Sequence, residues 1–265
     1  MKLICSVLCA VLLLAAPIFA GRRFNGTSDT ISAPGVSNAI DLTGTTVTMS
    51  CWFMMTSSPG TNDVSPCSKW AANNQGGYLI VYNCNPSACN GINGSGKMSA
   101  AIYDTIPVNH WQFVLCNTTI NLNQWYVVTM MYQNNNGIYI YLGTNGSSSQ
   151  CGVNNGVGST GVLVSSANNL IMAGPHGACA TNSWSVCTYF TGLVAETAVW
   201  NAALTADQIN TLVWMCPGSP KFFPRPVGYW PLWGAASPEP DQSGNVINAT
   251  VTGTAVDVHP PCRRF

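Results

Sequence analysis

The acidic side chains of this sequence are too few and too far apart for a common kind of hydrolytic site. A glycosidase needs two carboxyl groups held about 5–10 Å apart. The 265 residues include nine Asp and Glu residues, of which only Glu239 and Asp241 lie within two positions of each other. Both lie in the proline-bounded run Ser237–Gln242, which is typical of a turn.

Other residues that could act in catalysis or bind zinc are equally scattered. His110, His176 and His259 have no Ser or Cys partner at a recognisable spacing. The sequence contains no Gly-rich phosphate loop, no His-Glu-x-x-His and no Cys-x-x-Cys. We therefore predict a protein that is not an enzyme.

Aromatic and amide side chains, which bind sugars by ring contact and hydrogen bonding, are plentiful in comparison. Strand-like patterns contain five Trp residues that we expect in the core: Trp52, Trp125, Trp200, Trp230 and Trp233. Five further residues lie in or beside predicted loops and form the candidate ligand platform: Trp70, His110, Trp111, Trp184 and Tyr189. Packing beneath a disulfide-linked loop is the alternative role for these five.

The first twenty residues have the pattern of a secretory signal. Lys2 precedes the apolar stretch Leu3–Leu14, and Ala20 ends a cleavage site before Gly21. No other stretch is long and apolar enough to span a bilayer, so we expect no transmembrane anchor. The sequence thus predicts a secreted protein, located outside the cell or at its surface.

The number of cysteines agrees with the prediction that the protein is secreted. Ten cysteines follow the leader: Cys51, Cys67, Cys84, Cys89, Cys116, Cys151, Cys179, Cys187, Cys216 and Cys262. An even number in an exported chain predicts five disulfides. Proximity favours Cys84–Cys89 and Cys179–Cys187, and the connectivity of the others stays open. We expect Cys216 or Cys262 to tie the C-terminal element to the domain.

Five Asn-x-Ser/Thr sequences predict N-glycosylation if the source is a eukaryote. They stand at Asn25, Asn93, Asn117, Asn145 and Asn248.

Charge is scarce in this chain. Charged residues make up 7% of the sequence and the net charge is zero, whereas about 25% is average for soluble proteins. Nucleic acids and anionic membrane surfaces are therefore excluded as expected partners. Low charge also removes the repulsion that keeps proteins apart, which favours a self-assembling fibre or coat subunit as an alternative function. Arg-Arg-Phe recurs at residues 22–24 and 263–265.

Alternation of apolar and polar residues predicts strands through most of the chain. The predicted strands are 46–53, 78–82, 97–103, 112–116, 125–132, 138–142, 170–173, 190–200, 228–233 and, more weakly, 249–252. Asn136-Gly137 predicts a hairpin between two of them. Thr205-Ala-Asp-Gln208 is a capping box, which predicts one short helix at about 205–214. We expect a single domain over residues 21–265.

Several of these segments together resemble one family. They are Phe24–Gly26 with Asp29–Ile31, Val47–Phe53, Trp125–Tyr132 with Ile138–Gly143, Gly192–Asn201 with Ala203–Ile209, and Tyr229–Trp233 with Asp241–Asn245. Each is similar to a strand, turn or capped helix of the laminin-G-like, concanavalin-A-like jelly-roll domains. The resemblance implies an all-β sandwich of two antiparallel sheets.

Calcium is a further expectation that this resemblance implies, because several members of the family hold the ion with acidic residues. Asn25 stands where Asp is common, and Ala195 replaces the first of two frequent acids, which leaves Asp29 and Glu196 as the candidate ligands. Two carboxylates are a small set for an ion that takes six to eight oxygens.

Composition, loop aromatics and resemblance together favour a secreted, non-catalytic module that binds an extracellular glycan or glycoprotein. The alternative remains the self-assembling subunit, which would form homo-oligomers or fibres.

Overall fold

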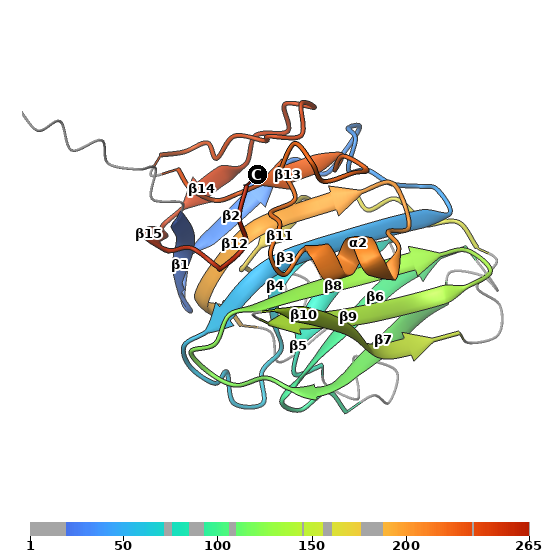
Figure 1. The fold of residues 1–265 in the computed structure, drawn as a ribbon, viewed down its shortest axis with the longest axis horizontal. Coiled ribbons are helices and arrows are strands. Elements are labelled where there is room, and N and C mark those ends of the chain that lie inside the picture. The colour runs from blue at the N-terminus through green and yellow to red at the C-terminus, as the bar shows by residue number, and fades with distance from the viewer. Residues whose placement is uncertain are drawn as a thin grey trace, which may run out of the picture.

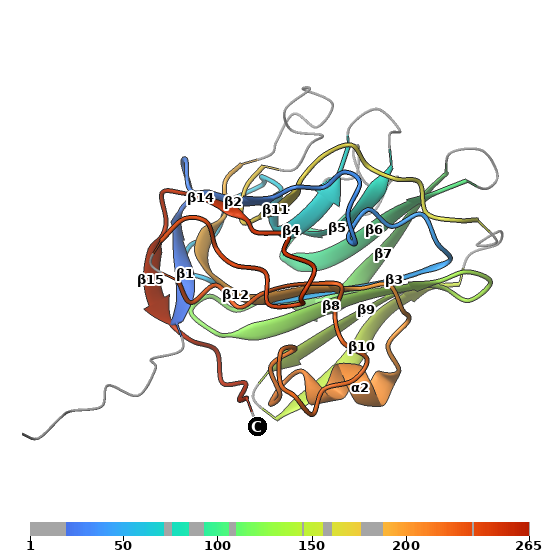
Figure 2. The same ribbon diagram turned by 90° about the horizontal axis from the view of Figure 1, so that it is seen from above.

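The computed structural model describes residues 20–71, 76–84, 93–105, 110–144, 146–155, 161–175, 188–234 and 236–264. In this part of the chain, strands form two antiparallel sheets that face each other (Figures 1 and 2). The predicted leader, except Ala20 at the start of the first strand, lies outside the described residues. Within them, no helix is long and apolar enough to cross a membrane.

The eight-stranded sheet has the order β10-β9-β8-β3-β12-β1-β15, with β13 paired to β12. Its strands are β1 (Ala20–Asn25), β3 (Thr46–Met55), β8 (Tyr126–Gln133), β9 (Gly137–Thr144), β10 (Ser147–Asn154), β12 (Thr191–Trp200), β13 (Gly228–Trp230) and β15 (Ala255–Val258).

The seven-stranded sheet has the order β14-β2-β11-β4-β5-β6-β7. Its strands are β2 (Thr30–Ala33), β4 (Val64–Trp70), β5 (Gly77–Tyr82), β6 (Lys97–Asp104), β7 (His110–Thr119), β11 (Leu170–Met172) and β14 (Thr250–Thr252). The predicted all-β sandwich of two antiparallel sheets is confirmed.

The main hydrophobic core lies between the two sheets. Alternation in β3 turns Val47, Met49, Cys51 and Phe53 towards this core, as the sequence pattern predicts. A second apolar cluster lies on the outer face of the eight-stranded sheet, and a third lies on the outer face of the seven-stranded sheet. Both sheets are therefore buried on two sides over part of their area.

The predicted helix is present but shorter than expected. Helix α2 spans Ala206–Thr211, and both hydrogen bonds of its capping box are formed. The Thr205 hydroxyl accepts from the backbone N–H of Gln208, and the Gln208 side-chain oxygen accepts from the backbone N–H of Thr205. Buried Ile209 belongs to the second cluster, and α2 lies on the outer side of the eight-stranded sheet (Figure 2). The chain leaves the helical conformation after Leu212, before the Pro217-Gly218 stop.

The two sides of the sandwich are closed differently. On one side, a disulfide between Cys116 of β7 and Cys151 of β10 joins the sheets. On the other side, one segment changes sheets, because β14 pairs with β2 and β15 pairs with β1 (Figure 1). This segment thus forms both edges on its side.

Cysteine pairing differs from the prediction at one place. Cys51 of β3 and Cys67 of β4 are unbonded thiols in this structure, although their sulfur atoms lie 3.0 Å apart between the sheets. Burial raises the pKa of the Cys67 thiol well above its usual value, so the thiol form is strongly favoured. A second disulfide joins Cys216 to Cys262, Cys84 is also disulfide-bonded, and Cys89, Cys179 and Cys187 lie outside the described residues.

Candidate functional site

Two residues of the predicted ligand platform meet on the outer face of the seven-stranded sheet. The rings of Trp70 and Trp111 lie 4.7 Å apart between centroids, edge to face. Trp111 also contacts Tyr103 at 5.7 Å and stacks on Phe113 at 5.8 Å. Trp111 is half-buried, whereas Trp70 and Tyr103 are 1% exposed. Residues 70, 103, 111 and 113 are referred to below as the aromatic platform.

Strand register explains this grouping. Tyr103 of β6 is directly opposite Trp111 of β7, so both side chains leave the sheet on the same face. Leu79 and Val81 of β5 lie on that face between β4 and β6. The sequence prediction missed Tyr103 and Phe113, because it took platform residues only from positions in or beside predicted loops and both of these lie within strands. Phe113 is two positions from Trp111, and Tyr103 is two positions from Ala101, so alternation along each strand would have placed both on the outer face.

Four buried polar atoms on this same face have no hydrogen-bond partner in the part of the chain that the structure describes: Ser68 Oγ, Trp70 Nε1, Ser99 Oγ and Tyr103 Oη. Ser68 precedes Trp70 by two positions on β4, and Ser99 precedes Tyr103 by four on β6, so each pair shares the outer face. Buried polar groups are almost always hydrogen-bonded, and a face with four exceptions needs a partner such as water or a ligand. Burial also raises the pKa of Tyr103, which keeps its hydroxyl a donor at neutral pH.

The other three predicted platform residues are not brought into this cluster by the described structure. His110 begins β7, paired with Asp104, but nothing is described of its side chain. Trp184 lies outside the described residues. Tyr189 is half-buried just before β12 and does not belong to the cluster that contains the platform.

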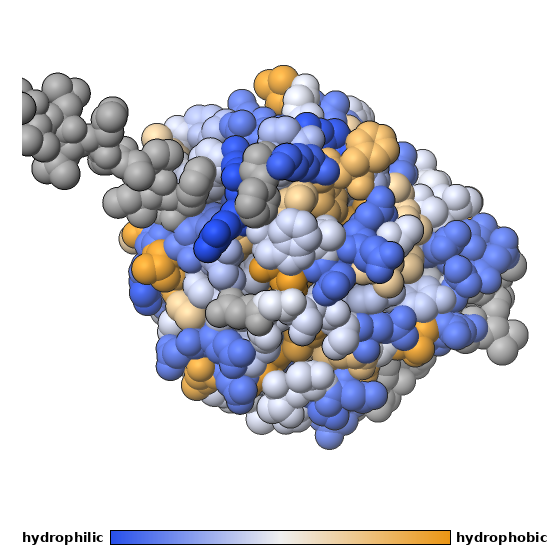
Figure 3. All heavy atoms as spheres, in the orientation of Figure 1, coloured by the Kyte–Doolittle hydropathy of each residue, from blue (hydrophilic) through white to orange (hydrophobic). Residues whose placement is uncertain are grey.

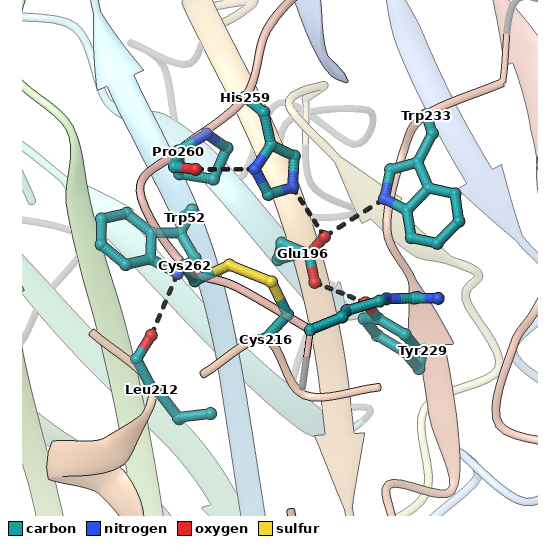
Figure 4. Close-up of a disulfide and its surroundings, with 10 residues drawn as sticks. Trp52, Glu196, Leu212, Cys216, Tyr229, Trp233, His259, Pro260 and Cys262 are labelled. Carbon is teal, nitrogen blue, oxygen red and sulfur yellow. Dashed lines mark hydrogen bonds and ion pairs between the residues drawn. A yellow bond between two sulfur atoms is a disulfide. The ribbon is translucent and has the colours of Figure 1, made fainter. Parts of the chain in front are cut away.

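A second group of polar residues surrounds Glu196 on the eight-stranded sheet (Figure 4). Glu196 is 1% exposed, and its φ of 53° falls at a register shift in β12. Its carboxylate accepts hydrogen bonds from the Tyr229 hydroxyl and from Trp233 Nε1, at 3.2 Å for the latter. His259 Nε2 lies 3.0 Å from the same carboxylate. Burial, and then the nearby Glu196 charge, raises the pKa of Tyr229 well above its usual value.

The C-terminal residues hold this group in place. The Arg264 guanidinium lies 3.8 Å from the centre of the Trp233 ring and donates to the Tyr229 hydroxyl at 2.9 Å. The Cys216–Cys262 disulfide lies beside Glu196 (Figure 4). Glu196, Cys216, His259 and Cys262 offer ligand-type atoms within 4.8 Å of one another.

This cluster does not fit calcium. Calcium takes six to eight oxygen ligands, whereas two of the four groups are sulfurs already joined in a disulfide. Both Glu196 oxygens are also occupied by protein groups. Asp29, the other predicted ligand, does not belong to the cluster. It is 8% exposed, and its Oδ2 accepts from the backbone N–H of Asn25 at 3.0 Å.

Two further carboxylates are held in ion pairs with buried cations. Arg22 Nη2 lies 3.0 Å from Glu239 Oε2, and both side chains are almost fully buried. Lys69 Nζ lies 3.2 Å from Asp41 Oδ1, and the Lys69 side chain is 1% exposed. Each of these carboxylates thus has a buried cation as its partner.

Four of the five predicted glycosylation sites lie at the surface. Asn25, Asn93, Asn117 and Asn248 are exposed, and Asn145 lies outside the described residues. Glycosylation at these positions stays a prediction.

Comparison with known proteins identifies a family over most of the chain. Residues 25–210 match the family model described as the concanavalin A-like lectin/glucanases superfamily. No curated protein is similar enough in sequence to count as a relative.

Solved structures resemble the fold at low sequence identity. A heptameric SAP-like pentraxin from Limulus polyphemus matches with a TM-score of 0.54 and 17% identity, over 94% of this chain and 99% of that one. Domains LG4-5 of mouse laminin alpha1 match with a TM-score of 0.45 and 13% identity, over 71% of this chain and 42% of that one. The Ruminococcus gnavus sialidase module CBM40, bound to alpha2,3 sialyllactose, matches with a TM-score of 0.44 and 12% identity, over 73% of this chain and 97% of that one.

Proposed function

Because the chain belongs to the concanavalin A-like lectin/glucanases superfamily, we propose that it is a secreted, non-catalytic module that binds an extracellular glycan or glycoprotein through the aromatic platform. The observation that carries this proposal is the half-buried Trp111 ring, which packs against Trp70 and Tyr103. Trp70 Nε1 and Tyr103 Oη have no hydrogen-bond partner among the described residues. A sugar presents hydroxyl groups to such atoms and C–H groups to an aromatic ring. The ion pairs of Asp41 and Glu239 with buried cations support the absence of catalysis at those carboxylates.

Replacing Tyr103 by phenylalanine separates binding from folding. The Tyr103 hydroxyl has no partner in the described structure, so its removal should leave the melting temperature unchanged or raise it. We expect glycan affinity to fall about tenfold if the sugar uses this hydroxyl. Binding is first located on a glycan array and then measured by calorimetry, with calcium and with EDTA, so that the two conditions also show whether binding depends on calcium.

Trp111→Ala should weaken the same binding at least about tenfold. Trp214→Ala is the matched control, because Trp214 is likewise a partly exposed Trp, at 44%. It comes shortly after α2, which packs over the eight-stranded sheet, whereas the aromatic platform belongs to the seven-stranded sheet. The proposal fails if Y103F and W111A bind every array glycan as the unmodified protein does.

One observation favours self-assembly as a second candidate function. The edge strand β15 exposes Val256 by 44% and Val258 by 56%, and hydrophobic atoms appear in Figure 3 at the side where Figure 1 places β15. An unpaired apolar edge is a template for another strand. If this edge mediates assembly, Val256→Lys with Val258→Lys should convert oligomers to monomers in light scattering. A wild-type protein that is monomeric at all concentrations would contradict this second function.

A further inference from the structure

We propose a second ligand site, for a neutral pyranose ring, in a pocket at the end of the eight-stranded sheet. The pocket has a volume of about 390 Å³ and is lined by Asn123, Gln124, Trp125, His259 and Pro261. Three of these residues precede β8, and two follow β15, so distant parts of the sequence build it. The site goes beyond the proposed function, because it shares no residue with the aromatic platform and lies on the other sheet.

Trp125 gives the pocket a fixed aromatic wall. Its ring contacts Trp52 edge to face, with 6.4 Å between centroids. Trp52 is 1% exposed and donates from Nε1 to the Leu212 carbonyl at 3.2 Å, which fixes the supporting ring. Trp125 itself is half-buried, so part of its ring remains open to the pocket. A rigid, partly open indole is the surface on which the C–H face of a sugar packs.

Two side-chain amides beside Trp125 retain unused hydrogen-bonding capacity. Gln124 Oε1 accepts from the Tyr126 hydroxyl at 3.1 Å, which orients the amide, while its Nε2 donates to no described residue. Asn123 is anchored by its backbone, whose N–H donates to the Met55 carbonyl at 2.8 Å. The Asn123 side chain makes no hydrogen bond with the described part of the chain. These amides can donate to and accept from sugar hydroxyls.

His259, another lining residue, is held in place by Glu196 (Figure 4). Both ring nitrogens of His259 are occupied, since Nδ1 lies 2.6 Å from the Pro260 carbonyl oxygen and Nε2 lies 3.0 Å from Glu196 Oε1. The Glu196 carboxylate is buried, and its oxygens interact with Tyr229, Trp233 and His259 inside the protein. His259 and Pro261 therefore offer ring surfaces to the pocket, positioned by a second layer of contacts.

The chemistry of the lining selects the ligand. No carboxylate, Lys or Arg belongs to the residues that line the pocket, and the ring nitrogens of His259 are directed at the Pro260 carbonyl and the Glu196 carboxylate rather than at a ligand. One aromatic face, two amides and two ring surfaces fit a neutral pyranose, and the volume is within the range of about 300–1,000 Å³ usual for small-molecule sites.

Asn123→Gly is the sharpest test, because Asn123 has a φ of 58° and Gly adopts this conformation without strain. The matched control is Asn135→Gly, since Asn135 has a φ of 64° in the turn between β8 and β9. The protein is titrated with the methyl glycosides of glucose, galactose and N-acetylglucosamine, and side-chain amide shifts are followed by NMR. We expect one of them to shift the Asn123 and Gln124 amides, and N123G to weaken that binding about fivefold or more while N135G does not.

The proposal is overturned if none of the three glycosides shifts these amides, or if N123G and N135G bind alike. Trp125→Phe provides a second check, because it keeps an aromatic ring against Trp52 but reduces the exposed ring face. It should weaken glycoside binding, but by less than the double variant Asn123→Gly with Trp125→Ala does. Failure here is distinguishable from failure of the aromatic platform, because Y103F and W111A leave this pocket intact. Loss of all glycan binding in W111A, with no effect of N123G, would retain the proposed function and reject the second site.

Discussion

Arg22→Met should lower the free energy of unfolding by about 3–5 kcal/mol, because it leaves the buried Glu239 carboxylate without its cation. Arg22 is 1% exposed in β1, and its guanidinium bonds to Glu239, to the Ala236 carbonyl and to Thr254 Oγ1. One side chain thus ties β1 to three positions of the C-terminal segment. Denaturant unfolding with disulfides intact measures the effect.

The double variant Arg22→Met with Glu239→Leu tests the cause of that loss. Removing both charges also removes the uncompensated carboxylate, so the double variant should be more stable than R22M alone. The Ala236 and Thr254 acceptors remain without Arg22, so wild-type stability should not return fully. A double variant that is as unstable as the sum of both single changes would contradict a direct interaction between the two side chains.

Asp41→Asn is expected to cost about 3 kcal/mol, because the buried Lys69 ammonium group would lose the carboxylate that compensates its charge. Burial lowers the pKa of Lys69, and the Asp41 charge opposes this only in part. Burial also raises the pKa of Asp41, but the hydrogen bonds from Ser165, Ser37 and Lys69 and the Lys69 charge together lower it by more, so it lies below its usual value of 3.8.

This pair also predicts a loss of stability in acid. A carboxyl group whose pKa is lower in the folded chain contributes stability above its unfolded pKa, and this contribution disappears as the pH falls through the folded value. For Asp41, stability should therefore be constant at neutral pH and decline below about pH 4, and the decline should be smaller in D41N. Unfolding curves between pH 7 and pH 2.5 measure this.

Asp257→Asn is the matched control for the stability measurement at neutral pH. Asp257 pairs with Arg23, but the Arg23 side chain is 48% exposed, so the pair should contribute less than about 1 kcal/mol. If D257N destabilises the protein as much as D41N does, burial of Lys69 is not the cause of the Asp41 effect.

Local pattern was sufficient to predict most of the fold. The strand at 46–53 and the capping box at Thr205 depend on neighbouring residues, and both are confirmed. Strands β4, β10 and β15 were missed, because β4 contains Pro66 and Lys69, and β10 is largely polar. Their pairing depends on the strands beside them rather than on an alternating pattern of their own.

The site could be predicted only in part. Exposed loops suggested Trp70 and Trp111, which do contact each other, but Trp70 is buried at the end of a strand. The pocket beside Trp125 could not be found, because His259 lies more than a hundred residues later in the sequence. No local pattern reveals that Glu196 leaves the regular strand geometry to hold His259.

The position of β1 between β12 and β15 has a consequence for biosynthesis. Arg22 is opposite Val194 on one side and Val256 on the other, so one neighbour of an early strand is made very late. At about 5–20 residues per second, the ribosome needs roughly ten to fifty seconds after β1 to synthesise β15. Until Thr250–Val258 emerges, both β1 and β2 present open edges at once, since the same short segment pairs with each. A nascent chain stalled before this segment would expose unpaired edges of both sheets together, a state prone to aggregation.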